Sequence, residues 1–192
     1  MNTFVLATIV EGEGDCAALP VLLRRLRPLW TFPRPIRVPR NKLIDQVRVS
    51  PRDEVLQKYL FLADVLIKEQ GGFGAVLIVQ DADDDCPAAL GPALRRRAQA
   101  LLPSRRCEAV LPKREFEAWF LAGKCVEWSG DPETMSDAKR PLQEALGKYS
   151  PTADQARLAQ RLDLDAASKA RSFRQLMSAL SRLDEIANSD KQ

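Results

Sequence analysis

The stretch TFVLATIVEGEGD at residues 3–15 decides the fold that this sequence predicts. Residues 3–10 form a continuous apolar run rich in β-branched side chains, which is typical of a strand buried on both faces of a sheet. Residues 11–14 are spaced by glycines as in a turn, and Asp15 is placed to cap a following helix or to join a cation site. This stretch therefore predicts a central strand that ends in acidic residues.

The stretch AVLIVQDADDD at residues 75–85 repeats this arrangement, with an apolar strand that ends in acidic residues. Apolar residues at helical spacing predict helices on either side of it, and further short apolar runs predict two more strands. The helices are expected over residues 15–28, 53–70, 87–102 and 113–121, and the strands over residues 36–38 and 107–111. Strands that alternate with helices predict the α/β class, with a Rossmann-like, mostly parallel sheet flanked by helices.

The character of the sequence changes after Gly123. Residues 1–125 are predicted to form the α/β core, and residues 126–192 a helical appendage packed on that core. Within the appendage, helical spacing is clearest over residues 154–163 and 168–187.

The composition is that of a globular protein, with 45% hydrophobic and 29% charged residues. The four cysteines show no CxxC spacing, which predicts reduced thiols in a cytoplasmic protein. The apolar residues 1–10 are too few for a signal peptide or a membrane span, so no membrane partner is expected.

Histidine is absent from the chain. This excludes Ser/His/Asp and Cys/His nucleophilic systems, histidine-dependent nucleases and zinc sites built on imidazole. Any catalysis must therefore use carboxylates, Lys, Arg, Ser, Tyr or Cys. Carboxylates suit hard metal ions that prefer oxygen ligands.

The acids at the two strand ends predict a divalent-metal site. Ligands of a parallel sheet bind outside the carboxyl ends of its strands, where Glu11, Asp81 and Asp83 are expected to lie. Residues two apart on an extended segment point the same way, so Asp81 and Asp83 are expected to converge on one cation. Asp84 and Asp85 are alternatively ordinary residues of a turn or helix start.

The predicted helix over residues 113–121 brings further candidates to the same edge. Its aromatic residues form an apolar stripe that is expected in the core. Glu115 and Glu117 either favour the positive end of the helix dipole or complete the metal site, with Glu117 the better candidate. Lys113 is a candidate to stabilise charge on a phosphoryl transition state, and its alternative is a solvated lysine.

A basic run lies between residues 24 and 52, with nine basic residues and the single acid Asp45. Such a run favours contact with phosphates, although a solvated basic face has the same composition. The residues predicted to grip a nucleic-acid backbone are Arg34, Arg37, Arg40, Lys42 and Arg48.

The acidic motifs occur in an order that resembles the TOPRIM (topoisomerase–primase) domain. VEGEGD at residues 10–15 and DAD at residues 81–83 match the Glu and the DxD that end two strands of that domain. With REFEAW at residues 114–119 and SF at residues 172–173, the chain resembles a bacterial family of stand-alone TOPRIM-like proteins. Members of that family are often encoded beside an ATPase in defence or mobile-element loci.

The resemblance implies a Mg²⁺- or Mn²⁺-dependent nuclease related to the overcoming-lysogenization-defect proteins. It implies Glu11 as ligand or general base, with Asp81 and Asp83 as metal ligands. Asp15 matches the second acid of the first motif, Asp85 is a candidate for a second ion, and Lys113 and Glu117 are the other catalytic candidates. An ATPase partner, anti-phage defence and a homodimer are further expectations.

Two other functions fit the same motifs. One is a non-catalytic TOPRIM-like subunit that regulates or binds an ATPase. The other is a haloacid-dehalogenase-type phosphatase or a sugar-nucleotide transferase, since these also carry a DxD after a strand. The phosphatase is disfavoured because its DxD lies near the first strand, whereas residues 81–83 follow a later one.

Overall fold

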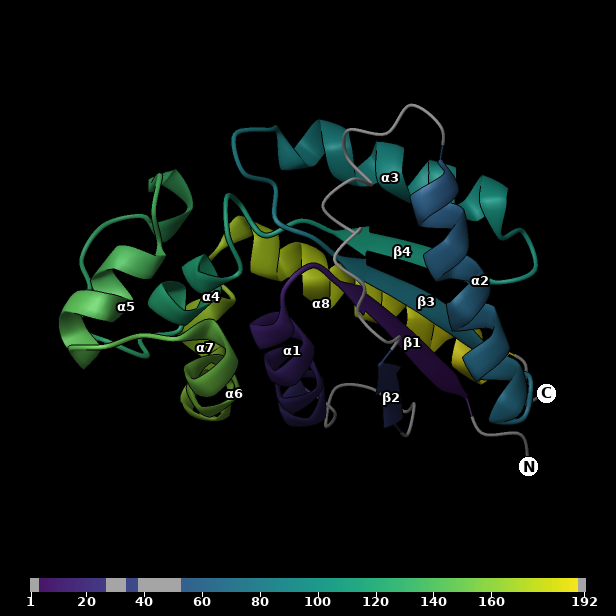
Figure 1. The fold of residues 1–192 in the computed structure, drawn as a ribbon, viewed down its shortest axis with the longest axis horizontal. Helices are drawn as coiled ribbons and strands as arrows, with labels where there is room; N and C mark the ends of the chain where they lie inside the picture. The colour runs from purple at the N-terminus through teal and green to yellow at the C-terminus, as the bar shows by residue number, and fades with distance from the viewer. Residues whose placement is uncertain (1–3, 27–33, 38–52, 190–192) are drawn as a thin grey trace.

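A computed structural model describes residues 4–26, 34–37 and 53–189 of the chain. Its centre is a parallel sheet with strand order β2-β1-β3-β4 (Figure 1). The strands are β1 (Val5–Val10), β2 (Arg34–Arg37), β3 (Gly74–Val79) and β4 (Arg106–Val110). The predicted α/β class and the parallel pairing are confirmed, and β4 lies at one edge of the sheet.

Helices cover both faces of this sheet (Figure 1). They are α1 (Glu13–Leu26), α2 (Glu54–Glu69), α3 (Pro87–Leu101), α4 (Glu117–Ala122), η3 (Pro132–Thr134), α5 (Lys139–Leu146), α6 (Pro151–Arg161), α7 (Leu164–Ala167) and α8 (Arg171–Ser189). Helices α2 and α3 pack on one face, while α1 and α8 pack on the other.

Alternate residues of the strands supply the two cores. On β1, Leu6 and Val10 join the core under α1 and α8, whereas Ala7 and Ile9 join the core under α2 and α3. All residues of β1 are buried. A strand with helices on both sides has no face to give to solvent, which explains the unbroken apolar run in its sequence.

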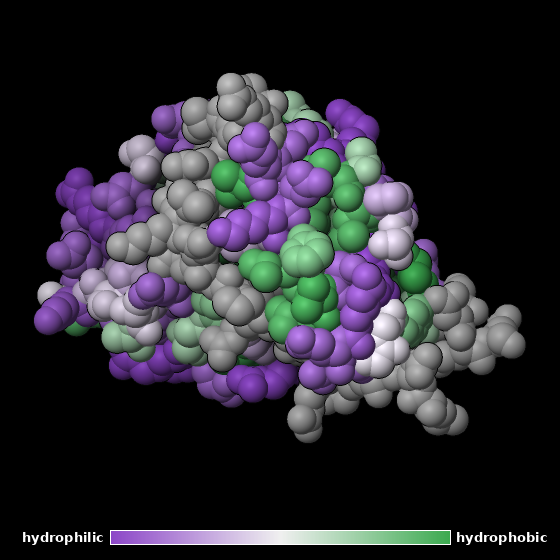
Figure 2. Space-filling model, turned by 45° about the vertical axis from the view of Figure 1, so that its right-hand side comes forward, coloured by the Kyte–Doolittle hydropathy of each residue, from purple (hydrophilic) through white to green (hydrophobic). Residues whose placement is uncertain are grey.

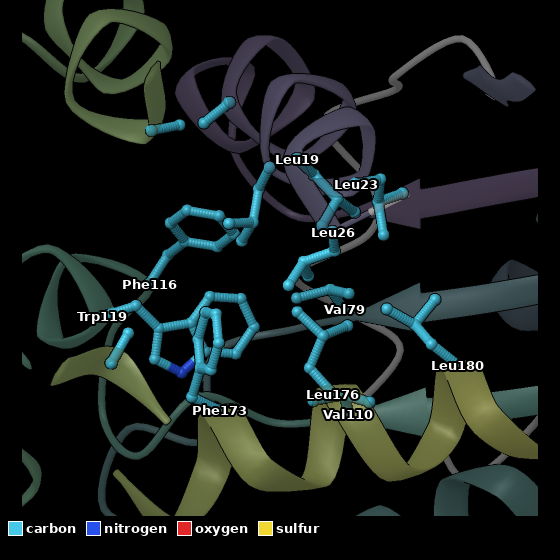
Figure 3. Packing of buried hydrophobic residues seen from close by; sticks show 14 of the residues in the cluster. Leu19, Leu23, Leu26, Val79, Val110, Phe116, Trp119, Phe173, Leu176 and Leu180 are labelled. Atoms are coloured by element: carbon cyan, nitrogen blue, oxygen red, sulfur yellow. The ribbon is translucent and has the colours of Figure 1, made fainter. Parts of the chain in front are cut away.

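The larger core brings α4 and α8 together around aromatic rings (Figure 3). Trp119 meets Phe173 edge to face, with ring centroids 5.5 Å apart, and contacts Phe116 at 4.8 Å. The indole N–H of Trp119 donates to Ser172 Oγ at 2.8 Å, so its one polar atom is satisfied inside the core. The prediction that the aromatic stripe lies in the core is confirmed.

The helix predicted over residues 113–121 begins later than expected, at Glu117. Residues before it bridge to the segment after β3, because the N–H of Ala82 donates to Pro112 O and the N–H of Asp83 donates to Arg114 O, each at 3.0 Å. Arg114 takes a positive φ of 63°, which a right-handed helix excludes. Tertiary hydrogen bonds therefore override local helical spacing here.

The C-terminal helices are tied to the first helix. Arg25 on α1 donates to Ala159 O at 2.8 Å and to Leu162 O at 2.6 Å, at the end of α6. Cationic donors at the last carbonyls of a helix satisfy groups that have no partner within the helix. The division between residues 125 and 126 remains a prediction about folding units.

The surface is polar over much of its area, but hydrophobic side chains gather on the face that carries α2 (Figure 2). Phe61 of α2 is 65% exposed. Among the described residues, no helix has the length and hydropathy needed to cross a membrane. The cysteines at positions 16, 86, 107 and 125 are free thiols.

Candidate functional site

The acids of the first two sequence motifs meet where β1 and β3 end. These strands are parallel neighbours, and Val10 lies opposite Val79 in their register. Glu11 follows the first strand directly, and its Oε2 accepts a hydrogen bond from the backbone N–H of Asp81 at 3.2 Å. Two acidic residues that are 70 positions apart in the sequence thus lie next to each other at the carboxyl edge of the sheet.

Asp15 is buried beside this pair, on the first turn of α1. The prediction that Asp15 itself precedes and caps the helix is wrong, because the helix already begins at Glu13. Instead, Asp15 Oδ2 reaches back and accepts from the N–H of Gly12 at 2.8 Å. This is the return half of a capping box, in which an acid at the third helical position satisfies the residue before the helix.

Glu117 is the most buried acid of the group, with 1% of its surface exposed. Its Oε1 accepts from the hydroxyl of Tyr149 at 2.9 Å and from Gln155 Nε2 at 3.1 Å. Burial raises the pKa of this carboxyl, and the charge of Lys139 and the hydrogen bond from Tyr149 compensate only in part. Within the described part of the chain, Gln155 Oε1 is buried without a hydrogen-bond partner.

Gly14 allows the close approach of α6 to this group. A β-carbon at Gly14 would lie 2.5 Å from Gln155 Oε1 and 2.7 Å from Pro151 O, far inside contact distance. Any side chain at this position would therefore push α6 away from α1. The second glycine of the EGEGD motif thus serves packing at the site.

The pKa of Asp81 responds to the charges of the whole acidic group. Burial raises its pKa well above the ordinary value, and three neighbouring carboxylates raise it further. Those carboxylates belong to Asp15, Glu11 and Glu117. Such a group is stabilised by a proton or by a bound cation.

Among the largest influences on the pKa of Asp81, only the charge of Lys139 lowers it. Its Nζ pairs with Glu115 Oε1 at 2.5 Å at the start of α5. Burial alone would lower the pKa of Lys139, but the hydrogen bond to Glu115 and the nearby carboxylates raise it, so the side chain stays protonated. Sequence reasoning missed Lys139 because no motif marks it.

Asp83 does not lie on an extended segment. Its φ is 44°, and its side chain is exposed. The rule that residues two apart point the same way holds only for extended backbone, so it does not apply at Asp83. The premise of the expectation therefore fails at Asp83, while its convergence with Asp81 and its ligation of a metal remain predictions.

The other acids of the cluster have roles in the turn before α3. The N–H of Asp85 donates to Ala82 O at 2.9 Å, and Asp84 forms an ion pair with Arg114. Lys113 donates from Nζ to the backbone oxygen of Asp85 at 3.1 Å. Binding of a second ion by Asp85 and charge stabilisation by Lys113 remain predictions.

The predicted nucleic-acid contacts lie mostly beyond what the structure describes. Arg34 and Arg37 belong to β2, where only the backbone is described. Arg40, Lys42 and Arg48 lie outside the described residues.

The donor set at the edge of the sheet fits a small hard cation. Among residues 4–26, 34–37 and 53–189, no three Asp, Glu or Cys side chains are arranged to hold a metal ion together. Mg²⁺ is usually bound by one or two carboxylates, with water and phosphate oxygens as the other ligands. Glu11 and Asp81 meet this smaller requirement, because Glu11 contacts the backbone of Asp81 and its charge acts on the Asp81 carboxylate.

Together, these features define a parallel α/β protein with coupled carboxylates at the ends of its central strands. Comparison of the chain with family models, curated proteins and solved structures gave no match. The side chains themselves are therefore the basis for assigning a function.

Proposed function

We propose that the protein hydrolyses phosphodiester bonds of nucleic acid with the help of Mg²⁺ or Mn²⁺, as a nuclease of TOPRIM type. The observation that carries the proposal is the contact of Glu11 with the backbone of Asp81 at the ends of adjacent parallel strands. Asp15 and Glu117 add their charge to the same group. A cluster of carboxylates in a partly dry site attracts a divalent cation.

The residues that would hold the cation are Glu11 and Asp81, with Asp15 beside them. When bound, the ion would polarise the phosphate and lower the pKa of an attacking water. Glu11 is exposed enough to accept the proton of that water, whereas Glu117 is held in place by Tyr149 and Gln155.

Lys139 supplies the positive charge of the site. Its pairing with Glu115 fixes the ammonium near Asp81 and Glu117. A protonated amine held in this way can stabilise charge that develops on a phosphoryl group. We therefore add Lys139 to Lys113 as a candidate for this role.

A non-catalytic TOPRIM-like subunit that binds or regulates an ATPase is the second candidate function. The observation that favours it is the absence of a three-residue metal group in the described part of the chain. In this case the buried acids would serve packing, with Asp15 capping α1 and Glu117 bonded to Tyr149.

The experiment that separates the two functions measures cleavage of end-labelled single- and double-stranded DNA and RNA with Mg²⁺ or Mn²⁺. Glu11→Gln and Asp81→Asn should each lower the rate by at least about 100-fold, because each removes a charge from the cation site. Asp165→Asn is the matched control, since Asp165 is exposed on α7. Equal rates in all three variants would overturn the assignment.

Calorimetry with Mg²⁺ and Mn²⁺ completes the test. Heat of binding that disappears in Asp81→Asn is expected for the nuclease. No cation binding and no cleavage, together with retained affinity for an ATPase, would favour the regulatory subunit.

A further inference from the structure

A second site lies at the edge of β4 that no described strand pairs with, on the opposite side of β3 from β1. A cavity of about 600 Å³ opens there, between the first turns of α3, the first turns of α8 and the start of η3. Volumes of about 300–1,000 Å³ are typical of sites for small molecules and cofactors. No residue of the acidic group at Glu11 and Asp81 lines this cavity.

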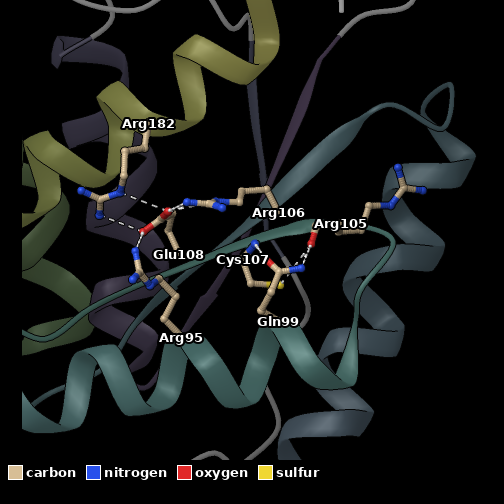
Figure 4. Close-up of polar contacts among 7 residues, drawn as sticks. All are labelled: Arg95, Gln99, Arg105, Arg106, Cys107, Glu108 and Arg182. Carbon is tan, nitrogen blue, oxygen red and sulfur yellow. Dashed lines mark hydrogen bonds and ion pairs between the residues drawn. The ribbon is translucent and has the colours of Figure 1, made fainter. Parts of the chain in front are cut away.

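The floor of the cavity is a buried carboxylate that is shared by arginines (Figure 4). Glu108 of β4 is fully buried and accepts from Arg182 Nε at 3.1 Å and Nη2 at 2.8 Å. Arg106 Nη2 lies 3.1 Å from the same carboxylate, and Arg95 Nη1 lies 3.7 Å from it. Burial alone would raise the pKa of Glu108, but the bonds and charges of these arginines lower it, so it stays ionised.

This floor carries more positive than negative charge. Arg95 and Arg182 line the cavity and share the single carboxylate of Glu108, which Arg106 contacts from outside the lining. Arg95 comes from α3 and Arg182 from α8, so both helices direct cations to the same point (Figure 4). An anion in the cavity would therefore meet guanidinium groups that one glutamate does not neutralise.

The rim adds cations, while its acids are already engaged. Glu133 accepts from the backbone N–H groups of Arg171 and Ser172, each at 2.7 Å, and so caps α8. Asp131 accepts from the N–H of Glu133 at 2.9 Å. Lys113 donates to a backbone oxygen. Among the described residues, no ion pair engages the side chain of Arg171 or Lys113.

The edge of β4 gives the cavity a hydrogen-bonding wall. Val110 O accepts from the N–H of Gln80, so Val110 faces β3. The N–H of Cys107 donates to Gln99 Oε1 on α3, away from β3. Alternate residues of a parallel strand face the same neighbour, so Ala109, which lines the cavity, turns its N–H and C=O to the free edge.

We propose that this cavity binds a nucleotide through its phosphate, either as a free mononucleotide or as the end of a nucleic-acid strand. The arginines of the floor and the cations of the rim receive the phosphate. The backbone of Ala109 offers one donor and one acceptor to the edge of a base, and the apolar side chains of Pro87, Pro92 and Leu111 line the walls. The inference goes beyond the proposed hydrolysis and requires neither cleavage nor a metal ion.

The test is calorimetric titration of the full chain in EDTA with AMP, inorganic phosphate and adenosine. AMP should bind most tightly, phosphate more weakly, and adenosine at least about tenfold more weakly than AMP, because a charge-assisted phosphate contact is lost. The same affinity is expected in Asp81→Asn, which separates this site from the acidic one. Failure of AMP to bind, or equal binding of adenosine, would overturn the proposal.

Two sets of variants locate the binding. The double variant Lys113→Ala with Arg171→Ala should weaken the binding of AMP at least about tenfold. Arg157→Ala, at an exposed position of α6 away from the cavity, should leave it unchanged. Gly91→Leu should abolish binding by filling the cavity, and Gly91→Ala should preserve it, because a β-carbon there lies 3.5 Å from Leu111 Cδ1. Circular dichroism checks that each variant is folded. Unchanged affinity in the double variant and in folded Gly91→Leu would place the ligand elsewhere and overturn the proposal.

Oligonucleotides distinguish a free mononucleotide from the end of a nucleic-acid strand as the source of the phosphate. An oligonucleotide with a 5′-phosphate that binds more tightly than AMP, and than its 5′-hydroxyl counterpart, identifies a strand end. Tighter binding of AMP than of either oligonucleotide identifies a free nucleotide.

Discussion

Two buried glutamates, Glu117 and Glu108, have pKa values shifted in opposite directions. Their exposed fractions are nearly equal, 1% and 0%. Glu117 accepts hydrogen bonds from neutral donors, and burial raises its pKa despite the charge of Lys139. Arginines surround Glu108, and its pKa is lowered. Burial makes an ionised carboxylate costly in both places, so the partners decide whether the group stays charged.

This difference in partners gives the acidic group around Glu117 and the arginine cluster around Glu108 opposite preferences for bound ions. At the ends of β1 and β3 the acids lack enough positive charge, which favours a bound cation. At the edge of β4 the arginines outnumber their carboxylate, which favours a bound anion. One sheet can therefore hold two sites of opposite charge, one at the ends of β1 and β3 and the other at the edge of β4.

Neutralising each glutamate would break the comparison most sharply. Glu108→Gln should lower the free energy of unfolding by about 2–3 kcal/mol, because it leaves three arginines without their charged partner. We expect this loss of unfolding free energy to be smaller than that for a fully buried ion pair, because the arginine side chains are partly exposed to solvent. Urea unfolding followed by circular dichroism measures it.

Glu117→Gln is the matched variant. Its amide oxygen still accepts from Tyr149 and Gln155, and the substitution removes a negative charge from an acidic group. We expect a change within about 1 kcal/mol. A loss as large as that of Glu108→Gln would show that the partners do not set the difference.

The pH dependence of stability tests whether the arginines keep Glu108 ionised. The folded pKa of Glu108 is depressed below its ordinary value of 4.5, so its contribution to stability is present above that pH. The contribution is lost as the pH falls through the folded pKa. The difference in unfolding free energy between the native protein and Glu108→Gln should therefore be constant near about pH 7 and shrink toward about pH 3. A difference that grows on acidification contradicts this assignment.

The strands and their acidic ends could be predicted because they depend on local patterns. An apolar run without alternation specifies a strand covered on both faces, and parallel strands bring their carboxyl ends to one edge. The adjacency of Glu11 and Asp81 follows from these rules. The extended backbone assumed at Asp83 was wrong, because a hydrogen bond from its N–H to Arg114 O holds the chain in a turn there.

The remaining site residues depend on tertiary contacts that leave no local pattern. Lys139 lies near the acids through the packing of α5, where it pairs with Glu115. Likewise, the cluster at Glu108 needs Arg95 from α3 and Arg182 from α8, which no short motif links. Two of its three arginines lie in ordinary charged positions of amphipathic helices, so sequence alone assigns them to solvent.

The hydrogen bond between Trp119 and Ser172 joins the two regions, since Trp119 lies on the helix that starts with Glu117 and Ser172 lines the cavity. Ser172→Ala leaves the buried indole N–H without an acceptor and should cost about 1–2 kcal/mol. Urea unfolding measures the loss, and Ser168→Ala is the control because Ser168 is bonded on the surface. Equal stability of both variants would mean that another acceptor replaces Ser172.

The smallest effect is expected at Phe61, which lies on the face of the sheet away from the aromatic core. With 65% of its surface exposed, its replacement removes little buried area. Phe61→Ser should change the unfolding free energy by no more than about 0.5 kcal/mol. Leu60→Ser, at the fully buried neighbouring position, is the contrast and should cost several-fold more, since it places a hydroxyl in an apolar core. Similar losses for the two variants would mean that Phe61 is covered by another part of the molecule in solution.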